Sequence, residues 1–185
     1  MKSSYVERAK VFIEAIYPYI EDSMQYTLRV QNAIRLFNTT CHRRVVMSSG
    51  MSRIALITSD YVIKWDYTQN TFYGTCETEY QLYNEHKDDD LSYLLAPVVC
   101  YTTHGKNFYI MPRVFKIAER IDDDLEIEEY LDDDERNYLF HDLALKDIHS
   151  GNWGFNRGSE TPMIFDYAWY DDKDDEESNE GTWSW

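Results

Sequence analysis

Three oxygen-bearing side chains in the last third of the sequence have types and spacing suited to metal-assisted chemistry. Asp147 and Asn152 lie five positions apart in a run that is typical of a loop. Asp166 follows the apolar run Met163 to Phe165, which predicts a short strand ending at its carboxylate. Magnesium favours oxygen ligands of this kind, with few protein groups and several waters. Acids and amides are also common in ordinary loops, so the residues upstream must show whether these side chains form a functional site.

The run Asp-Ile-His-Ser-Gly-Asn from Asp147 to Asn152 resembles the catalytic loop of protein kinases and aminoglycoside-type phosphotransferases. It looks most like that of small kinases made by bacteriophages. These families deliver a second aspartate from a following strand, and Asp166 has that place here. The resemblance implies ATP and Mg²⁺ as cofactors. It also implies that Asp147 orients the attacking hydroxyl, and that Asn152 and Asp166 hold the metal ion.

A lysine in a predicted strand supplies a cation for the same chemistry. Val62 and Lys64 share one face of this strand, because side chains alternate between faces. The run resembles the kinase strand whose lysine holds the α- and β-phosphates, and Val62 would then cover the adenine. Residues 75–85 are predicted to form a helix, from which kinases supply a glutamate that pairs with the lysine. Glu79 is the candidate because it shares a face with apolar residues, and Glu77 is the alternative.

The resemblance also indicates where adenine would bind. Kinases place their hinge just after a strand such as the one that ends at Met111. Pro112 has no N–H, so adenine would be held by the Arg113 or Val114 amide, or by the Met111 carbonyl.

The remaining pattern predicts an α+β, kinase-like fold. Hydrophobic periodicity and turn residues predict helices over residues 4–20, 22–37, 75–85 and 127–143, and strands over residues 45–47, 53–57, 61–65, 94–100, 108–111 and 163–165. We expect four parts: N-terminal helices (1–40), a small antiparallel β lobe plus one helix (41–114), a truncated C-terminal lobe with the catalytic loop (115–170) and an acidic tail (171–185). The C-terminal lobe is called truncated because few residues follow it.

Two positions depart from the family pattern. The turn expected to cover the phosphates has one glycine, Gly50, where kinases have several, so its backbone cradle would be poorer. Ala168 stands where protein kinases have glycine.

The composition limits the classes of partner. A formal net charge of −16 disfavours direct nucleic-acid binding and permits basic protein partners. The sequence has no run of eighteen apolar residues, so no membrane span is expected. The three scattered cysteines indicate reduced thiols and a cytoplasmic location.

Together these observations predict an ATP- and magnesium-dependent phosphotransferase. The resemblance implies a phage-encoded Ser/Thr protein kinase that acts on host proteins in the bacterial cytoplasm. Two alternatives stay open, because a fold does not fix a function. One is a kinase-like pseudoenzyme, and the other is an acidic inhibitor that mimics nucleic acid and binds a host protein.

Overall fold

The computed structural model describes residues 3–20, 31–32, 34–35, 38, 45–49, 53–66, 75–116, 127–146, 148, 151–155 and 161–167. The helix predicted over residues 22–37 lies largely outside these ranges, and the acidic tail lies entirely outside them. Within the described residues the fold class is α+β, as predicted. No helix in this part of the chain is long and apolar enough to cross a membrane.

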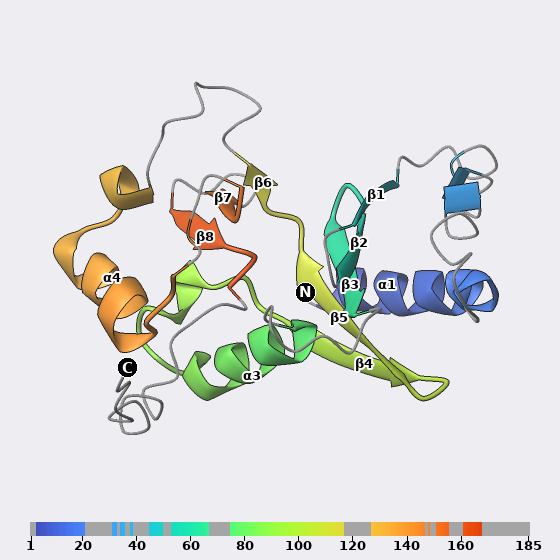
Figure 1. Ribbon diagram of the computed structural model, residues 1–185, viewed down its shortest axis with the longest axis horizontal. Coiled ribbons are helices and arrows are strands. Elements are labelled where there is room, and N and C mark those ends of the chain that lie inside the picture. Colours follow the sequence, from blue (N-terminus) through green and yellow to red (C-terminus); the bar gives the residue numbers. More distant parts are fainter. Residues whose placement is uncertain are drawn as a thin grey trace, which may run out of the picture.

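A five-stranded antiparallel sheet, with strand order β1-β2-β3-β5-β4, forms the centre of the described structure (Figure 1). Its strands are β1 (Val46–Ser49), β2 (Arg53–Ile57), β3 (Tyr61–Asp66), β4 (Val99–Thr103) and β5 (Lys106–Pro112). Tight turns join β2 to β3 and β4 to β5. His104 and Gly105 have positive φ angles of 52° and 73°, as the second turn requires. The strands predicted over residues 53–57, 61–65 and 108–111 are therefore confirmed.

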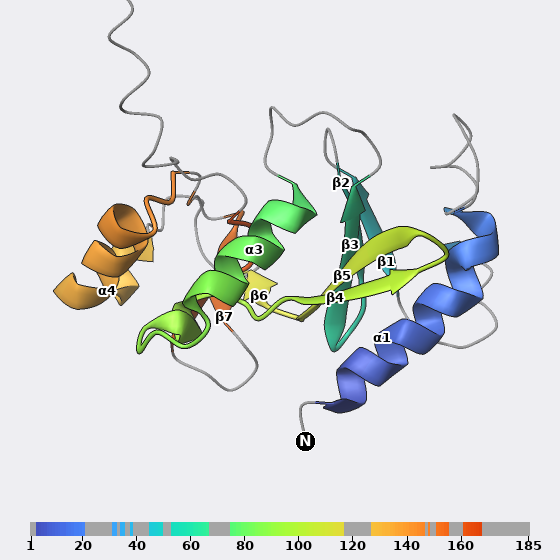
Figure 2. The ribbon, with the colours of Figure 1, turned by 90° about the horizontal axis from the view of Figure 1, so that it is seen from below.

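Two helices lie on opposite sides of this sheet (Figure 2). Helix α1 (Ser3–Ile16) lies on one side, where it packs with Ile63 and Trp65. Helix α3 (Cys76–His86) lies on the other, where Val62 packs with Leu82 in a second cluster. The alternation along β3 thus separates two hydrophobic clusters, and it turns Val62 and Lys64 toward α3.

The predicted apolar face of α1 is confirmed. Ala9, Ile13 and Ile16 are buried at helical spacing against the sheet. The α-helix ends at Ile16, and Pro18 lies in the 3₁₀ turn that follows (Tyr17–Tyr19). Proline removes a backbone donor, so it is accommodated in this turn and not inside the helix.

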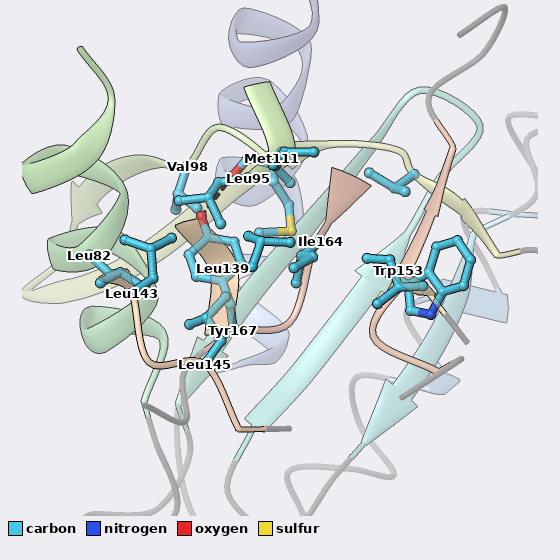
Figure 3. Close-up of a cluster of buried hydrophobic side chains, with 14 of the residues drawn as sticks. Leu82, Leu95, Val98, Met111, Leu139, Leu143, Leu145, Trp153, Ile164 and Tyr167 are labelled. Atoms are coloured by element: carbon cyan, nitrogen blue, oxygen red, sulfur yellow. Dashed lines mark hydrogen bonds between the residues drawn. The ribbon is translucent and has the colours of Figure 1, made fainter. Parts of the chain in front are cut away.

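A smaller sheet and a group of short helices lie beside the main sheet, on the far side from α1 (Figure 1). The sheet has the order β6-β7-β8, from β6 (Phe115–Lys116), β7 (Trp153–Phe155) and β8 (Pro162–Ile164). Strands β7 and β8 pack with α3 in the second hydrophobic cluster, in which Tyr167, Ile164 and Leu139 lie together (Figure 3). The short strand predicted just before Asp166 is confirmed as β8, which pairs with β7 in a hairpin.

Two predicted elements differ from those observed. The helix predicted over residues 127–143 is divided into a 3₁₀ turn (Ile127–Tyr130), α4 (Asp133–Asn137) and a π-helical turn (Tyr138–Asp142). Asp132 and Glu135 form a capping box that starts a new helix and ends the preceding one. The strand predicted from residue 94 begins only at Val99, because Pro97 cannot donate to a ladder.

Candidate functional site

The end of β3 and the start of α3 are tied together, and this connection positions Lys64 and Glu79. Asp66 is the last residue of β3, and both its carboxylate oxygens accept the Cys76 N–H at 3.2 Å. Thr75 is the N-cap and forms a capping box with Thr78. Glu79 therefore lies in the first turn of α3, facing the strand that carries Lys64.

Lys64 and Glu79 form the predicted ion pair. Lys64 Nζ lies 3.0 Å from each carboxylate oxygen of Glu79, and Glu79 is fully buried. Lys64 Nζ also donates to the Phe165 carbonyl at 2.6 Å. The alternative partner, Glu77, accepts a hydrogen bond from the Tyr109 hydroxyl instead. The lysine thus joins β3, α3 and the segment immediately before Asp166.

A second cation, which the sequence analysis did not identify, enters the same site. Arg53 Nη1 lies 2.7 Å from Glu79 and 2.8 Å from Asp166. Arg53 is paired with Asp66 in the β2–β3 register, two positions from the pair formed by Ala55 and Lys64. Directly paired residues share a face in an antiparallel sheet, so the register alone would have placed Arg53 beside Lys64.

Asn152 lies next to Asp166 through the backbone. The Asn152 carbonyl accepts the Phe165 N–H at 2.9 Å and the Asp166 N–H at 3.4 Å. Asn152 is buried, whereas the Asp166 side chain is 30% exposed. The hairpin of β7 and β8 therefore brings together the two residues predicted to hold a metal ion.

Burial and mutual charge set the protonation of this cluster. Burial alone would raise the pKa of Asp166, but Lys64 and Arg53 outweigh it and lower this pKa to about 2. Complete burial raises the pKa of Glu79 to about 7, despite the neighbouring Lys64. Burial also favours a neutral Lys64, but Glu79 and Asp166 hold its pKa above the ordinary value. At neutral pH, Glu79 is therefore the group nearest its titration point.

The other predicted site residues are placed only in part. Asp147, the predicted hydroxyl-orienting residue, lies outside the described residues, although Lys146 and Ile148 on either side are described. Ile148 packs against the second hydrophobic cluster.

The residues predicted to hold adenine lie at the junction of β3 and β5. Val62 is opposite Met111 in the register, and Met111 and Val114 are buried. The Arg113 N–H donates to the Asp60 carbonyl at 3.0 Å. The Arg113 amide is thus already used within the protein. Of the two backbone amides predicted to hold adenine, the Val114 amide is therefore the better candidate.

The donor set fits a magnesium–polyphosphate group. Asp166 is held ionised and partly exposed, and the backbone carbonyl of Asn152 accepts its N–H. A carboxylate and a side-chain amide oxygen are ligands of the type that Mg²⁺ takes. Lys64 and Arg53 supply positive charge on the same side. Among the described residues, no three His, Cys, Asp or Glu side chains form a group that could hold a metal ion.

Comparison with models of protein families, with curated proteins and with solved structures found no match to this chain.

Proposed function

We propose that this chain is an ATP- and magnesium-dependent phosphotransferase with a kinase-like arrangement. The observation that carries the proposal is the buried ion pair of Lys64 and Glu79, with Asp166 bound to the same cluster through Arg53. Burying several charges is costly, and breaking such a network is costlier still. A chain gains little stability from a buried charge cluster that a packed apolar core would not give, which favours a role in ligand binding.

The order of the elements supports the kinase-like description. A strand pair is followed by the strand with Lys64, by the helix with Glu79, by a second hairpin, by a helical segment and by the hairpin before Asp166. Four of these parts carry or precede the cluster residues: β2 carries Arg53, β3 carries Lys64, α3 carries Glu79 and the last hairpin precedes Asp166.

The residues of the site have different roles in this proposal. Lys64 holds Glu79 and the Phe165 carbonyl, and so fixes the position of Asp166 against the sheet. Asp166 and Asn152 supply the oxygen ligands for magnesium, which offsets the negative charge of the phosphates when bound. Asp147 orients the acceptor hydroxyl. A serine or threonine of a host protein as acceptor, and a phage as the source, rest on the likeness of residues 147–152 to phage kinases.

One observation favours a second candidate, a kinase-like pseudoenzyme. Asp166 Oδ1 is engaged by Arg53 at 2.8 Å, so a metal ion must share this carboxylate or displace the arginine. A protein that keeps nucleotide but transfers no phosphate would fit this contact.

Thermal unfolding with ATP, with and without magnesium, tests nucleotide binding. A ligand at 100 times its Kd stabilises the native state by about 2.7 kcal/mol. We expect a magnesium-dependent rise in Tm for the wild type and a much smaller one for Asp166→Asn, whereas the exposed Asp88→Asn should match the wild type. No rise in the wild type, or equal rises in all three proteins, would contradict the proposal.

A further inference from the structure

The guanidinium of Arg53 is only partly used by its protein partners. Both of its ion pairs, to Glu79 and to Asp166, are made by the same atom, Nη1. Nε and Nη2 make no hydrogen bond to any residue in the described part of the chain. The Arg53 side chain remains 24% exposed, although it lies against the fully buried Glu79. One edge of this planar group is thus held, and the other is available to a ligand.

Lys64 differs from Arg53 in this respect. Its ammonium group has three donors, and the structure gives it three acceptors: both oxygens of Glu79 and the carbonyl of Phe165. It must release a protein partner before it can bind a phosphate oxygen. Arg53 can bind a phosphate without such a loss.

The segment between β1 and β2 is a second reason to expect a side-chain donor for phosphate here. The sequence between β1 and β2 has one glycine, Gly50, where glycine-rich phosphate-binding loops have several. Arg53 is the first residue of β2, directly after that segment, and its side chain lies on the sheet face that carries Lys64. A side chain here can do what the backbone of a glycine-rich turn would do.

We infer that Arg53 is a phosphate-binding residue of this site, which holds the phosphates of a nucleoside di- or triphosphate with its Nε–Nη2 edge. The inference rests on the proposed function, because it takes the ligand to be a nucleotide. Arginine presents parallel N–H donors that match two phosphate oxygens, which a lysine cannot do. Two cations and two carboxylates leave the ligand-free cluster near neutral, so an anion does not meet a net negative charge there.

Isothermal titration calorimetry with adenosine, ADP and ATP tests this role. The variants are Arg53→Met, which removes the charge, and Arg53→Lys, which keeps the charge but loses the planar fork. Arg8→Met is the matched control, because Arg8 is an exposed arginine paired with Asp60. We expect Arg53→Met to lose about 10- to 100-fold in affinity for ADP and ATP. Arg53→Lys should lose part of that affinity, and adenosine affinity should not change in either variant.

The outcomes separate this inference from the proposed function. One possible result is that the wild type binds ATP and that Lys64→Met weakens this binding, whereas neither Arg53 variant weakens it. The role of Arg53 is then wrong, and the proposed function stands. If adenosine affinity falls as much as ATP affinity, Arg53 only supports the structure, and the inference is wrong. If the wild type binds neither adenosine nor ATP, both are wrong. Should Arg53→Met fail to fold, Arg53→Lys alone decides between these results.

Discussion

Glu79 is the carboxylate on which both buried cations converge, so removing its charge is the sharpest perturbation of the site. The substitution Glu79→Gln keeps the size of the side chain and its place in α3. It leaves Lys64 and Arg53 facing one carboxylate, that of Asp166, in a region where Lys64 is almost fully buried. Arg53 keeps its proton at any working pH, whereas Lys64 loses the carboxylate that does most to raise its pKa against the effect of burial. The variant must therefore bury either an uncompensated positive charge or a lysine that has given up its proton, and both lower the free energy of unfolding.

The expected cost differs between the two partners of the ion pair. Removing one partner of a buried pair typically costs about 3–5 kcal/mol, and we expect this for Glu79→Gln. Lys64→Met leaves Glu79 bound to Arg53 at 2.7 Å, and Glu79 can also take up a proton, since its pKa is already about 7. We therefore expect a smaller loss, about 1–3 kcal/mol, for Lys64→Met.

The loss in Lys64→Met should also depend on pH. Loss of the lysine raises the folded-state pKa of Glu79 further above its unfolded value of 4.5. The folded variant then binds a proton at higher pH than the wild type does, so its relative stability rises as the pH falls. The difference from wild type should be smaller at pH 6 than at pH 8.

Urea-induced unfolding at both pH values measures these quantities. Glu85→Gln is the matched control, because Glu85 is an exposed glutamate on the same helix. The double variant Lys64→Met/Glu79→Gln should be more stable than Glu79→Gln alone, because the charges are again balanced. The reasoning is refuted if Glu79→Gln costs no more than Glu85→Gln, or if Lys64→Met costs more than Glu79→Gln.

Three further predictions concern the elements that hold the site. Thr75→Ala removes the N-cap of α3 and should lower the free energy of unfolding by about 1 kcal/mol; no change in urea unfolding would show that the cap is dispensable. Tyr167→Phe removes a buried hydrogen bond to the Ala96 carbonyl, 2.7 Å long, and should cost about 1–3 kcal/mol in the same assay, since that carbonyl loses its donor. Glu14 has a lowered pKa because it accepts hydrogen bonds from Thr103 and its neighbours in the β4–β5 hairpin. Their stabilisation is present above pH 4.5 and lost as the pH falls through the lowered pKa, so the Tm difference between wild type and Glu14→Gln should narrow in acid; a constant difference would contradict this.

The parts of the site that depend on local pattern could be predicted from the sequence. Alternation along one strand placed Lys64 on the inner face, and the periodicity of the next helix placed Glu79 toward it. Thr75 marks the start of this helix within the sequence itself. The strand that ends just before Asp166 was predicted from a short apolar run. Each of these inferences needed only a few neighbouring residues.

The parts that depend on long-range pairing could not be predicted in the same way. Arg53 stands at the start of a strand, where an arginine is usually exposed, and its role depends on the β2–β3 register and on a carboxylate far away in the chain. The division of the predicted helix at Asp132 depends on a capping box that competes with helix continuation. Leu95 falls within the strand predicted over residues 94–100 but lies outside β4. It makes an isolated parallel bridge to Ile164 instead, which is a long-range contact.

Transfer of phosphate is the most direct test of the proposed function. The purified chain is incubated with magnesium, radiolabelled ATP and a bacterial lysate, and acid-stable label in protein is counted for wild type and Asp147→Asn. Both proteins should bind ATP with the same affinity, and the wild type should transfer label about 10²–10⁴-fold faster, as expected for a positioned base. A wild type that binds ATP with magnesium, yet labels neither lysate proteins nor itself, would contradict the assignment as an enzyme and identify a pseudoenzyme.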